Sequence, residues 1–186
     1  MRFCSHCGQP VELRIPEGDD RYRHVCVQCN TIHYQNPRVI VGCLPVSGER
    51  ILLARRAISP RRGFWTLPAG FLENGETTLQ GAERETWEEA RAKVEKAEIY
   101  RIFDLPHIDQ IYMFYRADLV GDDFGPGSES LEVELFDEKD IPWQELAFPV
   151  VYETLLEFLE DRRNGHFPVR VSGMDPGWRN WLRPIE

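Results

Sequence analysis

Acidic residues gather in the stretch GAERETWEEARA, residues 81–92, where Arg84 and Glu85 are followed two residues later by Glu88 and Glu89. On a helix, residues three and four positions apart lie on one face, so the three glutamates point to one side. Carboxylates held this close repel one another unless a cation offsets their charge. Mg²⁺ and Mn²⁺ are bound by carboxylates, often beside substrate phosphates. The stretch alone predicts either a metal-binding face or the charged outer side of an ordinary helix.

Signals around these glutamates predict the helix that must position them. Thr77 and Gln80 form a capping-box pattern just after the Asn74-Gly75 turn, and no proline follows within the stretch. An apolar stripe at spacings of three and four indicates that one side of this helix packs on a sheet. The stripe consists of Leu79, Ala82, Thr86 and Ala90.

Four of the five cysteines form two CxxC pairs separated by 18 residues, namely Cys4, Cys7, Cys26 and Cys29. Four thiolates at this spacing are typical of tetrahedral Zn²⁺. Two disulfides are the alternative, which a reducing compartment disfavours. A shell of four cysteines leaves no open position for water, so we expect a structural zinc that stabilises this short segment. The fifth, Cys43, lies in an apolar run and is expected in the core.

Composition limits the classes of function. With 186 residues the chain can bury one main core and carry a small appendage. A formal net charge of −9 disfavours binding to nucleic acid, and no run approaches the roughly 20 apolar residues of a membrane span. The first ten residues contain no apolar signal-peptide core, so we expect a cytoplasmic protein that does not bind membranes.

The remaining sequence predicts an α+β main domain after the cysteine-rich segment. We expect a zinc ribbon at 1–35, a main domain at 36–165, and a tail at 166–186 that packs on the domain or on a partner subunit through Trp178 and Trp181. Pro37 marks the linker, and a C-terminal helix is expected at about 147–163. Strands are expected at 39–46, 51–55, 97–103, 109–119 and 131–136.

A longer spacing distinguishes between the two interpretations of the acidic helix. Gly70 is followed after five residues by Glu76, and Glu76 after seven residues by Arg84-Glu85-Thr86-Trp87-Glu88-Glu89. This resembles the Nudix box, the loop-helix-loop signature of the Nudix hydrolases. The sequence departs at Arg91, where the family has a glycine that ends the helix, and at Thr86 and Ala92, where it has aliphatic residues. We expect the helix to continue one residue further here.

The resemblance extends over roughly residues 4–165, and it is strongest to zinc-ribbon Nudix hydrolases that include plant plastid enzymes acting on ADP-ribose and FAD. It implies an α/β/α sandwich around a mixed sheet, and frequently a homodimer. It also implies hydrolysis, with Mg²⁺ or Mn²⁺, of a nucleoside diphosphate linked to another moiety, releasing AMP.

By the same resemblance, Glu85 and Glu89 are the principal metal ligands, with Glu88 a further ligand and the Gly70 carbonyl a contributor. Glu76 and Arg84 would form an ion pair that braces the loop on the helix. The general base would be Glu89 or a carboxylate from a later loop. The candidates for that later carboxylate are Glu129 and Glu132, for which the alternative is a solvent-facing strand edge.

Residues that could bind the substrate lie before and within the box. Arg55 and Arg56 could hold phosphates, with a solvated loop as the alternative. Trp65 and Phe71 could stack on a base, although most aromatic residues belong to the core.

The choice of substrate is less defined by the sequence. The downstream motif of NADH-hydrolysing relatives is missing, which disfavours NADH, and the sequence does not rank ADP-ribose against FAD. Two alternatives stay open, namely a catalytically weak nucleotide-binding sensor, and an RNA-cap or NADH-type pyrophosphatase that uses the ribbon for recruitment.

Overall fold

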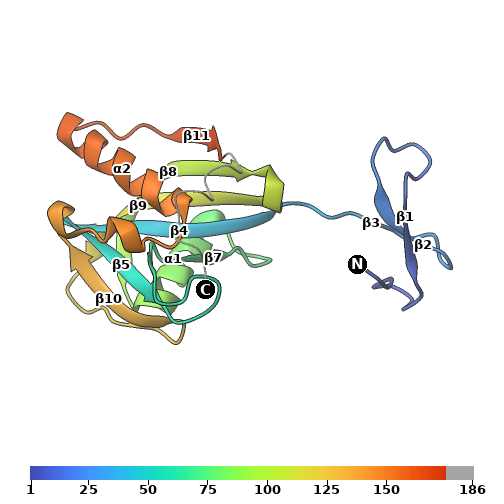
Figure 1. Cartoon of the computed structure of the whole chain (residues 1–186), viewed down its shortest axis with the longest axis horizontal. Helices are drawn as coiled ribbons and strands as arrows, with labels where there is room; N and C mark the ends of the chain where they lie inside the picture. The colour runs from blue at the N-terminus through green and yellow to red at the C-terminus, as the bar shows by residue number, and fades with distance from the viewer. Residues whose placement is uncertain (175–186) are drawn as a thin grey trace. The chain divides into compact units, whose positions relative to one another are not determined.

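The computed structural model describes residues 1–174, which divide into two compact units, Met1–Asn36 and the chain from Pro37 onward. The first unit contains a three-stranded antiparallel sheet (Figure 1). Its strands are β1 (Val11–Arg14), β2 (Arg23–Cys26) and β3 (Ile32–His33). A sheet this small buries little apolar surface, so the unit needs another source of stability.

The second unit is built on a mixed sheet in which β4 pairs parallel with β9 and antiparallel with β5 (Figure 1). Two short strands, β6 (Trp65–Thr66) and β7 (Ala69–Phe71), pair with β5 and β4. The main strands, in order across the sheet, are β10 (Ser130–Phe136), β5 (Arg50–Arg56), β4 (Arg38–Ser47), β9 (Gln110–Val120), β8 (Lys93–Leu105) and β11 (Arg170–Gly173). Short 3-10 helices lie at Pro106–Ile108, Glu138–Asp140 and Trp143–Glu145.

Alternation along the strands gives the sheet two apolar faces. On β4, Val41 and Cys43 pack with Ala82 of helix α1 (Thr78–Ala90), whereas Leu44 packs in the cluster that contains Leu155 of helix α2 (Pro149–Asn164). A helix therefore covers each face, and the α/β/α sandwich expected from the resemblance is confirmed. Burial of Cys43 raises the pKa of its thiol to about 12, as expected for an inert core cysteine.

The capping box expected at the start of α1 is present. The Thr77 hydroxyl accepts a hydrogen bond from the Gln80 backbone N–H, and the Gln80 side chain accepts one from the Thr77 N–H. These two bonds satisfy backbone donors that the first turn of a helix otherwise leaves unpaired. They fix where the helix begins and so which residues face the sheet.

The end of α1 corrects the sequence expectation. The helix stops at Ala90 instead of continuing, and Arg91 adopts the left-handed conformation with φ 51°. This is the conformation that a C-terminal glycine supplies without strain, so Arg91 takes the same backbone position at a cost of about 1 kcal/mol. The guanidinium of Arg91 lies 5.7 Å from the centre of the Trp87 ring, which offsets part of that cost.

After α2 the chain returns to the sheet as β11, which pairs parallel with β8 at the sheet edge. The part of the expected tail that carries Trp178 and Trp181 lies outside the described residues. Within residues 1–174, neither helix is long and apolar enough to cross a bilayer.

Candidate active site

Glu89 is the most buried carboxylate of α1, with 8% of the residue exposed. Its Oε2 accepts a hydrogen bond of 3.0 Å from the backbone N–H of Ala69 on β7, which ties the helix to the sheet. Loss of solvent, assisted by the nearby Glu85 carboxylate and opposed by the Ala69 hydrogen bond, raises the pKa of Glu89 to about 7. A buried carboxylate of this kind would bind a divalent cation strongly because the cation restores the missing charge balance.

Glu85 lies one turn before Glu89 and against the backbone of Gly70. A Cβ atom added at Gly70 would lie 2.3 Å from Glu85 Oε2, closer than any real contact, so only glycine leaves room for this carboxylate. Burial raises the pKa of Glu85, and the guanidinium of Arg84 acts in the opposite direction. The Gly70 requirement of the motif is therefore steric, since the side chain of Glu85 occupies the space that a Cβ would fill.

Arg84 ties the loop to the helix. Its Nη2 and Nε donate to the Glu76 carboxylate at 2.7 and 3.0 Å, and Nη2 also donates to the Phe71 carbonyl at 3.1 Å. The Arg84 hydrogen bonds hold the pKa of Glu76 at about 2. Arg84 Nη1 also donates to Glu85 at 2.7 Å and to Glu88 at 3.0 Å. Arg84 therefore offsets part of the repulsion within the acidic face.

A loop far along the chain completes the end of α1. The N–H of Gly125 donates to the Ala90 carbonyl at 2.9 Å, and the N–H of Gly127 donates to the Glu89 carbonyl at 3.0 Å. The loop packs so closely that a Cβ at Gly127 would lie 1.7 Å from a backbone oxygen of α1. This contact brings Glu129, two residues later, to the acidic face, where its charge adds to the rise in the pKa of Glu89.

These side chains surround a cavity of about 930 Å³. Five carboxylates line it, together with the side chains of Arg56, Arg84 and Arg91. A volume near the upper end of the range for small-molecule sites accommodates a ligand as large as a dinucleotide. The lining carboxylates are Glu73, Glu85, Glu88, Glu89 and Glu129.

Two of the predicted substrate-binding residues lie at this cavity. Arg56 donates from Nε to the Pro60 carbonyl at 2.9 Å, and its guanidinium lies 5.1 Å from the centre of the Phe148 ring. Phe71 also lines the cavity and is 47% exposed. Arg56 presents the positive charge that a substrate phosphate requires.

The structure does not bring the other predicted residues into the cavity lining. Trp65 is only 6% exposed and packs edge-on against Phe136 at 4.9 Å, so it belongs to the core. Glu132 stands opposite Arg55 on paired strands, and their side chains form an ion pair of 2.8 Å. Because this pair satisfies both charges outside the cavity, Glu129 is the better placed of the two later glutamates.

Phe148 and Met174 are among the cavity-lining residues that sequence reasoning overlooked. Phe148 precedes α2 and Met174 follows β11, so both are distant from the motif along the chain. Nothing in their local sequence marks them, because the strand order of the sheet is what brings them to the site.

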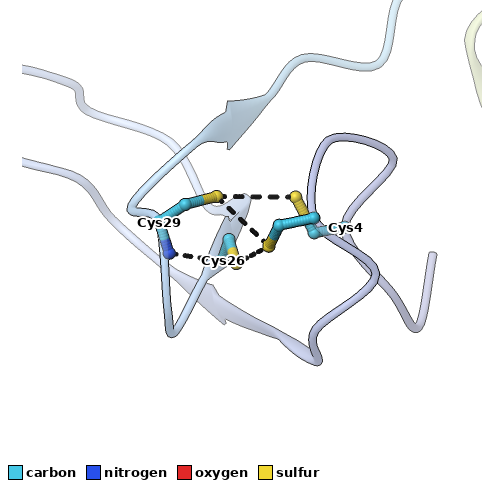
Figure 2. Close-up of side chains that lie close together, drawn as sticks. Cys4, Cys26 and Cys29 are labelled. Carbon is cyan, nitrogen blue, oxygen red and sulfur yellow. Dashed lines mark hydrogen bonds between the residues drawn. The ribbon is translucent and has the colours of Figure 1, made fainter.

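The second cluster of ligand-type residues is the set of four cysteines (Figure 2). Their sulfur atoms all lie within 4.8 Å of one another, with Cys7 Sγ 3.4 Å from both Cys26 and Cys29, and Cys4 Sγ 3.7 Å from Cys29. Tetrahedral zinc with Zn–S bonds near 2.3 Å places sulfurs about 3.8 Å apart, so the residues fit this metal. All four are free thiols, not disulfides.

The backbone around the cysteines is shaped for the same purpose. The N–H of His6 donates to Cys4 Sγ at 3.3 Å, and the N–H of Gln28 donates to Cys26 Sγ at 3.4 Å. Gly8 and Asn30, which follow the two CxxC pairs, both have positive φ, at 74° and 55°. Each pair thus sits on a tight turn whose N–H groups would stabilise metal-bound thiolates.

Within the described residues, the carboxylates of the cavity are not drawn together as tightly as the four cysteines. Two of these carboxylates, Glu85 and Glu88, form ion pairs with Arg84. The donor set, which consists only of carboxylate and carbonyl oxygens, fits a hard cation such as Mg²⁺ or Mn²⁺.

An acidic helix and loop on an α/β/α sandwich, opening on a cavity that also has basic side chains, are the arrangement expected of the Nudix fold. Comparison with protein families agrees, because the NUDIX domain matches residues 36–158 and the Nudix N-terminal zinc ribbon matches residues 2–35. The chain belongs to the Nudix hydrolase family.

Individual relatives show where the similarity lies. The chain is 34% identical over 125 residues to the NAD-capped RNA hydrolase NudC of Edwardsiella ictaluri, covering 66% of this chain and 46% of that protein. It is 32% identical over 177 residues to human mitochondrial NAD(P)H pyrophosphatase NUDT13, covering 95% of this chain and 46% of that protein. It is 30% identical over 119 residues to the ADP-ribose pyrophosphatase of Methanocaldococcus jannaschii, covering 62% of this chain and 69% of that protein.

Among solved structures, a NUDIX hydrolase from Nitrosomonas europaea is 55% identical, with a TM-score of 0.91, covering 94% of this chain and 99% of that one. The chain spans about half the length of the first curated relatives that it matches. The expected similarity to plant plastid enzymes stays a prediction. The relatives named for capped RNA do not support the expectation that nucleic acid is an unlikely partner.

Proposed function

We propose that this protein hydrolyses the pyrophosphate bond of a dinucleotide-type substrate, a nucleoside diphosphate linked to another moiety, and releases AMP. The observation that carries the proposal is a cavity in which five carboxylates and Arg56 meet apolar walls. Such a cavity matches a ligand with a charged centre and less polar ends. The named activities of three relatives, on NAD-capped RNA, NAD(P)H and ADP-ribose, share this chemistry.

The acidic side chains would hold the catalytic Mg²⁺ or Mn²⁺, with Glu85 and Glu89 as principal ligands and Glu88 and Glu129 in support. When bound, such an ion neutralises phosphate oxygens and lowers the pKa of water. Glu89 is also positioned to accept a proton, because burial already raises its pKa to about 7. Glu76 and Arg84 keep the loop that carries Gly70 fixed against the helix.

Among nucleoside diphosphates linked to another moiety, we propose ADP-ribose and NADH as the first candidates, with FAD retained from the sequence resemblance. The absence of the NADH motif counts against NADH, but the likeness to an NAD(P)H pyrophosphatase over nearly the whole chain restores this alternative. Arg56 would bind the phosphate that is not attacked. A cytoplasmic location, a homodimer and a structural Zn²⁺ in the ribbon remain proposals of the same standing.

Hydrolysis of ADP-ribose, NADH and FAD with Mg²⁺ or Mn²⁺, followed by release of AMP, tests the proposal. Glu89→Gln should reduce kcat by at least about 100-fold, since it removes a metal ligand and proton acceptor. Glu83→Gln is the matched control, because Glu83 is an exposed residue of the same helix that does not line the cavity. Equal rates in wild type and Glu89→Gln would instead support a nucleotide-binding sensor.

A second candidate, hydrolysis of NAD-capped RNA, is favoured by the NudC relatives. The ribbon unit has four arginines and four acidic residues, so it adds no net charge to attract phosphates. Aromatic side chains could still contact unpaired bases, and Phe3, Tyr22 and Tyr34 are exposed there. Comparing kcat/KM for a short NAD-capped RNA and for NADH, in wild type and in Tyr22→Ala, tests it. Selective loss on RNA is the expected result.

A further inference from the structure

The chain after α2 lies beyond the residues that match the Nudix domain, which end at residue 158, yet it reaches the cavity. Strand β11 pairs with β8 from Arg170 to Gly173, and the N–H of Met174 donates to the Asp104 carbonyl at 3.0 Å. The Met174 side chain packs against the core cluster and lines the cavity together with Leu105 and Phe148. A segment outside the family match therefore supplies part of the wall.

The strand order places Met174 far from the carboxylates. Glu89 is bonded to β7, and from there β4, β9, β8 and β11 follow one another across the sheet. Four intervals of about 4.8 Å separate β7 from β11, or roughly 19 Å. The cavity thus has an acidic region over β7 and an apolar region towards β11, where Tyr112 also lines it.

Buried polar contacts hold β11 in position. Arg170 donates to both oxygens of Asp161 on α2, at 2.5 and 2.6 Å, and Tyr100 donates to the same carboxylate at 2.6 Å. Arg101, 2% exposed, donates to the Ser172 hydroxyl at 3.0 Å. Strand β11 is therefore attached to the domain by side-chain hydrogen bonds at Arg170 and Ser172 as well as by its backbone hydrogen bonds to β8.

We propose that Met174 is a specificity-determining residue that contacts the nucleobase of the substrate, and that Arg170 is its positioning residue. The inference rests on the proposed function, since it assumes a substrate whose pyrophosphate lies at the carboxylates. A flat base suits this apolar region, because the flexible thioether of methionine packs well against aromatic rings. The distance to the acidic region matches an extended ligand whose reacting group and base are well separated.

Steady-state kinetics on the dinucleotide that wild type hydrolyses best tests the role of Met174. Met174→Ala should raise KM about tenfold with kcat within about twofold, as expected for loss of apolar contact with a group that does not react. Met174→Leu should restore KM to within about threefold, because it keeps the apolar volume. Val171→Ala is the matched control, since Val171 lies on the same strand but is 62% exposed. An unchanged KM in Met174→Ala overturns the proposal.

A double-mutant cycle tests the positioning role of Arg170. If Arg170→Ala acts only by displacing Met174, it should raise KM in wild type and add little in the Met174→Ala background. Additive effects on KM would show that Arg170 has no such role. Thermal unfolding of each variant separates this effect from a general loss of structure.

Binding of AMP keeps this inference distinct from the proposed function. Should wild type hydrolyse no dinucleotide, the proposed function fails, and calorimetric titration with AMP still tests the nucleobase contact. AMP should bind about tenfold more weakly to Met174→Ala than to wild type or Val171→Ala. Equal affinities in the three proteins would reject the contact whatever the catalytic result.

Discussion

At the scale of single residues, the site depends on how closely atoms can approach. Glu89 is buried and accepts a hydrogen bond from a backbone N–H of β7, and Glu85 occupies the space that a side chain at position 70 would need. Sequence spacing predicts that Gly70 and the glutamates of α1 lie together, because a motif within one loop and helix has fixed geometry. It does not predict that Trp65 and Glu132 lie outside the cavity lining, since burial and cross-strand pairing are set by distant segments.

Gly70→Ala should reduce kcat/KM by about 100-fold, because a Cβ 2.3 Å from Glu85 Oε2 forces the carboxylate to move by about 1 Å. The hydrolysis assay measures the change, and thermal unfolding checks that the variant is folded. Gly125→Ala is the control, since a Cβ there meets no atom within 4 Å and its backbone φ is not positive. Activity of Gly70→Ala equal to that of the control would contradict the steric explanation.

At the scale of elements, α1 begins where its sequence predicts and ends by a tertiary contact. The Thr77–Gln80 capping box is local and was predictable. The left-handed conformation of Arg91 and the N–H donors of Gly125 and Gly127 were not predictable from the sequence. The loop that supplies these donors lies more than 30 residues after α1, and no local pattern connects it with the end of the helix.

Arg91→Gly should stabilise the protein by about 1 kcal/mol, raising Tm by roughly 2–4 °C, because glycine adopts the left-handed conformation without strain. Arg91→Ala, which keeps the strain and loses the contact with Trp87, should instead lower Tm slightly. Differential scanning calorimetry distinguishes them. A lower Tm in Arg91→Gly than in wild type would show that the contact with Trp87 outweighs the backbone strain.

The Asp161 contacts give the attachment of β11 a defined pH dependence. The Arg170 hydrogen bonds, against the opposing effect of burial, hold the pKa of Asp161 below its ordinary value of 3.8. A depressed carboxyl pKa contributes stability that is fully present above the unfolded-state pKa and lost as the pH falls through the folded-state value. Asp161→Asn should therefore cost about 3 kcal/mol at neutral pH, and less below pH 3.8.

Denaturant unfolding at several pH values measures this difference directly. Subtracting the Asp161→Asn curve from the wild-type curve removes the contribution of all other titrating groups. A difference that stays constant down to the acid limit would exclude Asp161 as the group responsible. Asp140→Asn serves as a control, because Asp140 has no ion pair among those seen in the described part of the chain.

At the scale of the whole molecule, the chain has two units, one with the four cysteines and one with the cavity. The fold class was predictable because alternating strands, a capped helix and a family signature agree with one another. The position of the four cysteines was also predictable, since CxxC spacing fixes a local turn. The apolar end of the cavity was not, because Phe148 and Met174 reach it only through the order of strands in the sheet.

Loss of zinc should unfold the ribbon and leave the hydrolysis of small dinucleotides within about twofold, because the proposed catalytic residues all lie in the second unit. Cys29→Ser, with zinc content measured by atomic absorption, tests this, and Ser5→Ala is the control within the same turn. Proteolysis should remove the ribbon from Cys29→Ser only. Equal loss of dinucleotide hydrolysis and ribbon structure would show that the two units depend on each other.

The contact between the Gly125–Gly127 loop and the end of α1 has a consequence for how this enzyme can change. The Gly125–Gly127 loop donates hydrogen bonds to the last carbonyls of α1 and also sets the position of Glu129. Both contacts therefore restrict the length of this loop. An insertion in the Gly125–Gly127 loop would move the carboxylate of Glu129. Insertions between Gly121 and Phe124 would instead extend into solvent. Family members with different loop lengths should therefore draw their additional carboxylate from another position along the chain.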